Sequence, residues 1–463
     1  MNLAETNPLG YERIGKLILR FSAPAIVSNL LNAFHNIVDQ ILIGHGIGYA
    51  GIAAIGITFP LVTITAAISI MLGVGCASAF NLYQGAGKHE KAAMIVGNGL
   101  IMMVVSGLFI TAMSLTFLDQ LLFLFGATPD IIDLSAEYSR IIVFGKPFQI
   151  LLVGAVFLIR SDGSPNWAMF TMMSGAVVKL IISPIFMFTF GWGVSGVAWA
   201  TVISQVLSAG VGLIYIFRGF KTIRLTRDTI RLRFANIKEI CMLGMAGFFN
   251  QFAMTIMNIV MNNTLRHYGG LSPYGISATL GAVSVATRVN MIFISCAVGL
   301  GQGCQPICGF NYGARNFARV KQTLKTAIIC NIVIGAMFFT LYQIIPRQIL
   351  GIFGEGSPEY FAFGTRFLRM FMLLTFVNGL QPLASSYFSS TGRAHMGVFT
   401  SMTRQIIFLI PLLLILPNFL GIDGVLYAGP IADLAAATLA IIFFTREFKK
   451  LNRRIKEYTL DEI

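Results

Sequence analysis

The chain is a succession of long apolar runs separated by short polar connections. A membrane-spanning helix needs roughly 20 mostly apolar residues, and about twelve runs reach that length. The alternating ten-residue pattern typical of a transmembrane barrel is absent. We therefore predict an all-α integral membrane protein with twelve transmembrane helices. The expected spans are residues 15–42, 49–83, 91–117, 133–160, 165–190, 194–219, 236–264, 276–310, 317–345, 358–390, 395–417 and 424–446.

The composition agrees with this pattern. Of the 463 residues, 56% are hydrophobic and 11% are charged, whereas a soluble domain is about a quarter charged. Six cysteines fall in or beside apolar runs, and none shows metal-ligand spacing. We interpret them as small buried hydrophobes, and we expect no metal and no cofactor.

The formal net charge of +14 could by itself indicate a nucleic-acid partner. The basic residues instead gather in every second connection and at both ends of the chain, whereas the alternate connections hold only Arg266 and Arg347. This is the positive-inside pattern with both termini cytoplasmic. The basic charge marks topology and contact with anionic lipid, and we expect no nucleic-acid partner. The basic positions are Arg13, Lys16, Arg20, Lys88, Lys91, the connector "RGFKTIRLTRDTIRLRFANIK", Arg315, Arg319, Lys321, Lys325, Arg393 and the tail "REFKKLNRRIK".

The chain repeats itself. "GVGCASAFNLYQGAGKHEKA", which begins at Gly73, aligns without gaps with "GQGCQPICGFNYGARNFARV", which begins at Gly301. Earlier, "NIVDQ" at Asn36 matches "NIVMN" at Asn258. Self-similarity at nearly the same separation, 228 residues for the first match and 222 for the second, indicates two copies of one structural unit.

Each copy holds six expected spans, so both copies begin on the same side of the membrane. This predicts two pseudo-symmetric six-helix lobes related by an axis along the membrane normal, an arrangement that secondary transporters use. We assign residues 1–219 to an N-lobe, 220–235 to a cytoplasmic linker, and 236–463 to a C-lobe with a basic cytoplasmic tail. The substrate cavity is expected between the lobes near the bilayer midplane.

The first span carries polar residues deep in an apolar run. Asn32, Asn36 and Asp39 are spaced i, i+4 and i+7, and His35 precedes Asp39 by four residues. On a helix they form one polar stripe, which we expect to face the lobe interior. A charge at membrane depth costs a few kcal/mol, and burial favours the protonated form of a carboxyl group. Asp39 is therefore a candidate proton-binding residue, and Pro24 could convert proton binding into a helix bend.

The repeat isolates Asp39. The polar residues beside it have polar counterparts in the second copy, Asn258 and Asn262, whereas Asp39 itself is matched by Met261. The fold does not require a carboxylate at this position, which favours a functional role for Asp39.

Five further charges lie inside or near apolar runs. Arg404 and Asp433 lie near helix ends, where a structural or snorkelling role is favoured. Arg288 lies deeper, and structural and site roles both stay open. The full set is Lys146, Lys179, Arg288, Arg404 and Asp433.

The motifs "NIVDQILIG", "RSDGSPNWAM" and "QPICGFNYGARNFARV", together with the two parallel lobes, resemble the MATE family of multidrug and toxic-compound extrusion antiporters. "RQIIFLIPLLLILP" and "AGPIAD" are similar to its bacterial MepA-type branch. The resemblance covers essentially the whole chain. It implies a MATE/MOP-type fold in the bacterial inner membrane. It also implies a monomer that exports amphipathic organic compounds in exchange for a cation, with H+ expected.

The resemblance also implies site residues. The family's proton-linked acid of the first helix matches Asp39, its bending proline matches Pro24, and two neighbouring polar positions match Asn32 and His35. The polar threonine of the sixth helix matches Thr201.

The chain departs from the family in its fifth helix. The family commonly has an Asn and, four residues on, an Asp, and these positions hold Lys179 and Ser183 here. A two-acid proton site is therefore not possible. Our hypothesis is that Lys179 pairs with Asp39, so that Lys179, proton and cargo compete for the carboxylate.

Sodium coupling is the less favoured alternative. The sodium-coupled branch uses an acid of helix seven and an Asp of helix ten, whereas helix seven has no acid within its span here and the helix-ten position is Asn378. Buried bases outnumber buried acids, so anionic and zwitterionic cargo stay open.

Two other functions compete with that of an antiporter. The chain has no HExxH, nucleophile-elbow or GxGD-type motif, so we do not expect an enzyme. A flippase for lipid-linked sugars, from the same superfamily, remains an alternative, because Lys179, Arg288 and Arg404 could form the cationic cavity that such proteins favour.

Overall fold

The computed structural model describes residues 7–46, 49–125, 131–226, 228–352 and 357–461. Side chains are described throughout these ranges except at 35–41, 43–46, 49–54 and 458–461. The described part of the chain is helical and without strands, which confirms the predicted fold class.

Within the described residues, ten helices are long and apolar enough to cross a membrane, and two bent helix pairs bring the number to as many as twelve. The continuous segments are α2 (Ile14–Gly46), α3 (Tyr49–Gly85), α4 (His89–Thr116), α8 (Pro165–Pro184) with η2 (Ile185–Thr189), α9 (Gly193–Ile214) with η3 (Tyr215–Gly219), α10 (Phe234–Gly270), α11 (Ile276–Gly313), α12 (Phe317–Ile344), α17 (Ala394–Met402) with η4 (Thr403–Leu409) and α18 (Ile410–Leu420), and α19 (Ile422–Asp461). Three short helices, α1 (Pro8–Tyr11), α5 (Leu118–Leu124) and α13 (Pro346–Gly351), lie outside the expected spans.

Two expected spans are broken inside. α6 (Ile132–Phe144) and α7 (Lys146–Ser161) meet at a bend of 48°. α14 (Pro358–Met370) is followed, after a bend of 52°, by α15 (Thr375–Asn378) and α16 (Leu380–Ser390). At the first break Pro147 has no N–H to continue the helical ladder, and the N–H of Gly145 turns to the carbonyl oxygen of Ile142.

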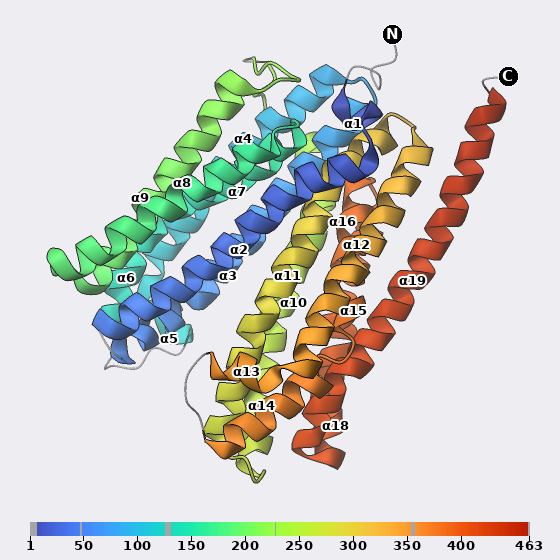
Figure 1. Ribbon diagram of the computed structural model, residues 1–463. Coiled ribbons are helices and arrows are strands. Elements are labelled where there is room, and N and C mark those ends of the chain that lie inside the picture. Colours follow the sequence, from blue (N-terminus) through green and yellow to red (C-terminus); the bar gives the residue numbers. More distant parts are fainter. Residues whose placement is uncertain (1–6, 47–48, 126–130, 227, 353–356, 462–463) are drawn as a thin grey trace.

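The helices form two bundles that lean apart. Figure 1 shows the blue and green helices α2 to α9 on one side and the yellow to red helices α10 to α19 on the other, with both termini at the same end. That end also carries the basic connections, the segment between η3 and α10, and the basic tail on α19. We call it the basic end, and the other the opposite end.

Hydrophobic packing joins the two bundles only at the basic end, as far as the described residues show. One cluster there combines Leu72 and Cys76 of α3 with Ile240 of α10, and a second combines Phe21 of α2 with Ile307 of α11. Towards the opposite end each cluster belongs to one bundle alone. The lobes are therefore closed together at the basic end and separate beyond it.

Glycines allow this close approach. A Cβ on Gly75 of α3 would stand 1.9 Å from the carbonyl oxygen of Ile240, and a Cβ on Gly244 of α10 would stand 1.8 Å from that of Met71. Small residues let membrane helices meet backbone to backbone, where dispersion contacts replace the hydrophobic effect.

Candidate functional site

Polar contacts tie the lobes together at the basic end. The Arg160 guanidinium on α7 donates from Nη1 to the side-chain oxygen of Gln302 on α11, over 3.1 Å. Asn29 of α2 donates to the carbonyl oxygen of Ser295 and, at 3.5 Å, to the same Gln302 oxygen. Arg160 is only 3% exposed, so this small network lies inside the seam between the lobes.

A second contact closes the seam nearer to the surface. The hydroxyl of Tyr83 on α3 donates to the Glu239 carboxylate on α10, with O–O distances of 2.7 and 2.9 Å. Hydrogen bonds to a charged acceptor are the stronger class. Separating the lobes at this end therefore breaks several specific interactions.

Beyond the seam, two sequence-predicted asparagines lie on the face of α10 that is turned to the N-lobe. Gly247 marks this face, because a Cβ on it would meet the Ile70 side chain of α3. Asn258 follows Gly247 by eleven residues, about three helical turns, and Asn262 follows one turn later. Both side chains are exposed. The two asparagines therefore make this face of α10 polar, and their role in a site stays a prediction.

Arg288 lies on the corresponding face of α11. Gly299 of α11 touches Ile26 of α2, and Arg288 precedes Gly299 by about three turns. Its side chain is half-buried. The structure thus brings Arg288 to the same side of the C-lobe as Asn258 and Asn262, as a site role would require.

Three N-lobe residues of the predicted network are buried. Lys179 and Ser183 of α8 are 3% and 1% exposed. Thr201 of α9 is also buried, but its hydroxyl donates to the Val197 carbonyl oxygen of its own helix over 2.9 Å. The Ser183 hydroxyl has no hydrogen-bond partner within the described part of the chain.

Several predicted positions cannot be placed. The side chains of Asp39, His35 and Asn36 lie outside the described residues, so their roles and the Asp39–Lys179 pairing stay predictions. Asn32 is described and exposed. Pro24 is buried inside α2, which runs on through it, and its carbonyl oxygen accepts a hydrogen bond from Ser28 over 2.8 Å.

A sequence profile of the MatE family matches residues 24–185 and 247–415, well over half of the chain. The chain belongs to the MatE family.

Relatives agree along nearly the whole length. The chain is 26% identical over 430 residues to the "Multidrug export protein MepA" of Staphylococcus haemolyticus (strain JCSC1435), with 92% of each chain covered. The structure named "Crystal structure of MATE in complex with MaL6" matches with a TM-score of 0.90 at 23% identity, covering 96% of this chain and 99% of that one. The structure named "Outward-facing conformation of a multidrug resistance MATE family transporter of the MOP superfamily" matches with a TM-score of 0.88 at 23% identity, covering 97% and 98%. The fold is thus of the MATE type, and the protein is a multi-pass membrane transporter and not an enzyme.

Several polar groups of this MatE chain were not predicted from its sequence. Arg160, Gln302 and Asn29 of the seam were not singled out, nor were two glutamines near Lys146. Gln149 of α7 and Gln205 of α9 each hold a buried side-chain oxygen without a partner among the described residues. A signal for Gln149 and Arg160 was present in "KPFQILLVGAVFLIR", where polar residues recur on one helical face.

No group of three His, Cys, Asp or Glu side chains that could hold a metal ion occurs among the described residues of either lobe. Asn378, at the position of the expected sodium-branch acid, is buried in α15. Arg404 of η4 and Asp433 of α19 form a buried ion pair. The pair gives these two residues a structural role and not a snorkelling one.

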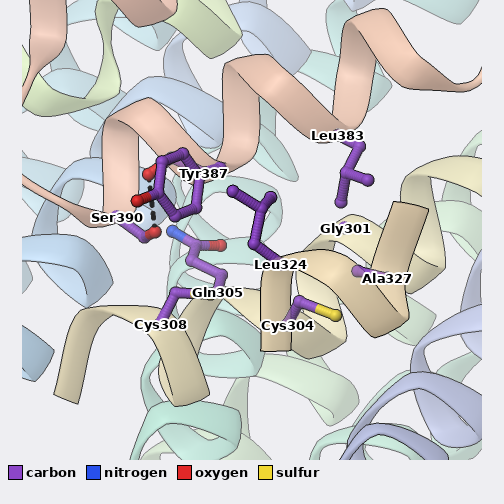
Figure 2. A pocket seen from close by; sticks show the side chains of 9 residues that line it. All are labelled: Gly301, Cys304, Gln305, Cys308, Leu324, Ala327, Leu383, Tyr387 and Ser390. Atoms are coloured by element: carbon purple, nitrogen blue, oxygen red, sulfur yellow. Dashed lines mark hydrogen bonds between the residues drawn. The ribbon is translucent and has the colours of Figure 1, made fainter. Parts of the chain in front are cut away.

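A small closed cavity lies in the basic half of the C-lobe (Figure 2). Its volume of about 10 Å³ leaves room for at most one water molecule. Cys304, Gln305 and Tyr387 are among its lining residues, and Gln305 donates to the hydroxyl of Ser78 in the N-lobe over 2.8 Å. The cavity is too small for an organic cargo.

The segment between the lobes is anchored by Asp162, which follows α7. Its carboxylate accepts hydrogen bonds from the Tyr215 hydroxyl, the Lys221 N–H, and the N–H and hydroxyl of Thr222, at 2.6 to 3.2 Å. Burial raises the pKa of Asp162 above its ordinary value, and the hydrogen bonds from Thr222, Lys221 and Tyr215 oppose that rise.

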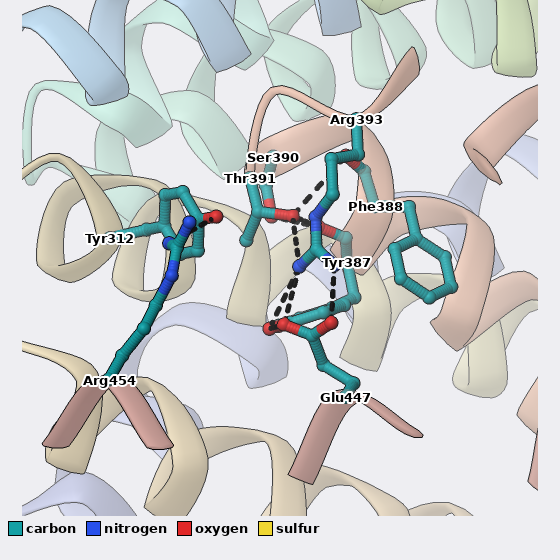
Figure 3. A network of polar contacts seen from close by, with 8 residues as sticks. All are labelled: Tyr312, Tyr387, Phe388, Ser390, Thr391, Arg393, Glu447 and Arg454. Atoms are coloured by element: carbon teal, nitrogen blue, oxygen red, sulfur yellow. Dashed lines mark hydrogen bonds and ion pairs between the residues drawn. The ribbon is translucent and has the colours of Figure 1, made fainter. Parts of the chain in front are cut away.

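A charged network fixes the tail helix to the C-lobe (Figure 3). The Glu447 carboxylate of α19 pairs with Arg393 and accepts from the Tyr387 hydroxyl over 2.9 Å. Arg454, two turns further on, donates to the Tyr312 hydroxyl over 2.8 Å. Burial lowers the pKa of Arg393, but its interactions with Glu447, Tyr387 and Tyr312 together outweigh burial and raise the pKa above the ordinary value.

Proposed function

We propose that this MatE protein is a secondary multidrug efflux transporter that exports amphipathic organic compounds in exchange for protons by alternating access. The observation that carries the proposal is the asymmetry of the lobe contacts. Both hydrophobic clusters that cross between the lobes lie at the basic end, within the described residues. Two lobes that meet at one end only form the kind of arrangement in which rocking exposes a central site to each side in turn.

The basic end is proposed to face the cytoplasm of a bacterial cell, because basic connections stay on the cytoplasmic side. The structure is then an outward-open state of a transporter in the cytoplasmic membrane, with both termini inside. The name of the Staphylococcus haemolyticus relative supports multidrug export as the activity. We propose that the transporter works as a monomer.

We propose Asp39 as the proton-linked residue. Its backbone lies in α2 ten residues beyond Asn29, about 15 Å further from the basic end, among the half of the N-lobe where Lys179 and Ser183 are buried. A carboxyl group at that depth is favoured in its protonated form, so it can take up a proton on one side and release it on the other. Because Ser183 replaces the family's second acid, Asp39 would act as the sole acid of this cluster.

The test uses the full chain in proteoliposomes and rhodamine 6G as a cationic dye. Dye transport driven by an imposed pH gradient, lost in Asp39→Asn and kept in the exposed control Asp133→Asn, would support the proposal. Transport driven by a sodium gradient alone would favour the sodium-coupled alternative and exclude the proton as the coupling ion. No dye movement under either gradient would overturn multidrug efflux, and binding of a lipid-linked pyrophosphate would then favour the flippase.

A further inference from the structure

The break between α6 and α7 places a lysine at the start of a half-helix inside the membrane span. Lys146 is the first residue of α7 and is 1% exposed. Side chains on a helix tilt towards its N-terminus, so the Lys146 side chain leans towards the break. No ion pair or hydrogen bond joins it to another of the described residues. A buried ammonium group without a counter-charge is strongly disfavoured, and such groups inside membrane spans usually mark a functional site.

Two glutamine side chains with unused hydrogen-bonding capacity lie beside Lys146. Gln149 follows it on α7 by three residues, which places the two on one helix face. Gln205 of α9 reaches the break itself, because a Cβ on Gly145 would stand 2.2 Å from its side-chain oxygen. The side-chain oxygens of both glutamines are buried without partners in the described part of the chain. An amide group offers donors when it is turned over, so both can contribute to an anion site.

A second lysine lies at about the same level of α9. Ala155 of α7 packs against Gly212 of α9, and the two helices run in the same direction. Lys146 precedes Ala155 by nine residues, so it lies level with about position 203 of α9. Gly175 of the antiparallel α8 packs between Ser204 and Ser208, so Lys179, four residues later, lies level with about position 202. The two lysines, one on α7 and one on α8, thus lie at nearly the same level of α9.

Positive charge continues along α7 towards the basic end. Arg160 follows Lys146 by fourteen residues, which brings it back to within about 40° on the helix face. Its Nη1 contacts Gln302 in the seam, while its buried Nε has no partner among the described residues. The face of α7 that carries Lys146 at mid-span therefore reaches the seam that must open towards the basic end.

We propose that the α6–α7 break holds the anionic group of an amphipathic cargo, such as a carboxylate, with the Lys146 ammonium group as its main contact. The partial positive charge of the α7 N-terminus acts in the same direction, and half-helix N-termini in transporters point at anionic groups of substrates. The inference rests on the proposed efflux function and adds that one class of the exported compounds is anionic.

The test compares two dyes that share a xanthene ring and differ in charge, rhodamine 6G and carboxyfluorescein. The protein is reconstituted in proteoliposomes as wild type, Lys146→Met, Lys146→Arg and the exposed control Lys325→Met. We expect Lys146→Met to lower carboxyfluorescein transport at least about tenfold, the loss of one charge-assisted contact, and to leave rhodamine 6G transport within about twofold of wild type. Lys146→Arg should retain both activities.

Stability separates this role from a structural one. Removal of a buried charge that has no counter-charge among the described residues should leave the thermal midpoint of Lys146→Met in detergent unchanged or higher, whereas removal of a structural contact would lower it. If Lys146→Met does not give a monodisperse protein, Lys146→Gln replaces it in both measurements.

Each outcome decides between the proposals. Transport of rhodamine 6G without carboxyfluorescein by the wild type would overturn the anion site and leave the efflux function standing. Carboxyfluorescein transport by Lys146→Met within about twofold of wild type would also overturn the anion site. Transport of neither dye would overturn both. A selective loss of carboxyfluorescein transport in Lys146→Met supports the anion site.

Discussion

Gly244 of α10 lies against the carbonyl oxygen of Met71 on α3, so close that a Cβ on the glycine would stand 1.8 Å from that oxygen. Backbone atoms cannot yield as a flexible side chain does. Gly244→Ala should therefore prevent full closure of the basic end and shift the protein towards a state open at that end. Spin labels on exposed positions of each lobe, at His89→Cys and Ala318→Cys in a cysteine-free background, should show a longer distance by electron–electron double resonance.

The matched control is Gly210→Ala in α9, where an added Cβ would meet nothing within 4 Å. This variant should leave the label distance unchanged. An unchanged distance in Gly244→Ala as well would mean that the lobes do not meet there in the membrane.

The hydrogen bond from Arg160 to Gln302 should contribute to the same closure. Gln302→Leu leaves the guanidinium in the seam without its acceptor, and such bonds to charged groups are worth about 1.5–3 kcal/mol. The label pair should again report more of the state open at the basic end. Arg160→Met combined with Gln302→Leu should restore part of the closed population, because no charge is then left unpaired. Purely additive single-variant effects would contradict a direct coupling.

The sequence predicted the twelve segments because length and hydropathy alone determine which runs can cross a membrane. It did not predict the break at Gly145, since a glycine followed two residues later by a proline is compatible with either a kink or a break. The position of that break turns Lys146 from one of five buried charges into the first residue of a half-helix.

Part of the candidate site could likewise be predicted from the sequence, and part could not. The repeat singled out Asn258 and Asn262, and both lie on one face of α10, because a shared helix face follows from spacing. Their role in the site stays a prediction. The seam contacts between Arg160 and Gln302 could not be predicted, because they join residues far apart in the chain whose meeting depends on how the two lobes are tilted. No pattern along a single helix carries that information.

The buried pair between Arg404 and Asp433 should be a strong stability determinant of the C-lobe. Both side chains are nearly inaccessible. Asp433→Asn would leave the guanidinium without its counter-charge, and breaking a buried pair from one side costs about 3–5 kcal/mol. We expect a clearly lower thermal midpoint in detergent. The double variant Arg404→Met with Asp433→Leu should recover most of the loss, and a failure to recover would show that the pair has partners beyond each other.

Glu447 and Glu457 provide a matched comparison on the same helix. Both pair with an arginine, but the Glu447 side chain is 4% exposed and the Glu457 side chain is 52% exposed. Glu447→Gln should lower the thermal midpoint, because Arg393 and the Tyr387 hydroxyl lose a charged partner in a buried network. Glu457→Gln should leave the thermal midpoint nearly unchanged, since exposed ion pairs are worth about 0–1 kcal/mol. Equal effects would contradict the burial argument.

Asp162 should hold the connecting segment to the N-lobe. Asp162→Asn replaces a carboxylate that accepts four hydrogen bonds with an amide group. The NH2 of that amide cannot accept a hydrogen bond from the N–H and O–H groups that the carboxylate served. Trypsin should then cleave faster at Lys221 and Arg224, as followed by mass spectrometry, while the exposed control Asp228→Asn should cleave as wild type does. Unchanged cleavage in Asp162→Asn would mean that the segment is held by other contacts.

The same residue gives a pH dependence with a definite sign. Burial raises the pKa of the Asp162 carboxyl group above its ordinary value of 3.8, so the folded state binds the proton more tightly than the unfolded state does. The contribution of Asp162 to the free energy of unfolding is then fully present below pH 3.8 and is lost as the pH rises through the raised pKa. Measured as thermal midpoints, the stability of wild type relative to Asp162→Asn should rise as the pH is lowered from neutral. A difference that stays constant or falls on acidification would show that the four hydrogen bonds outweigh burial and hold the pKa at or below its ordinary value.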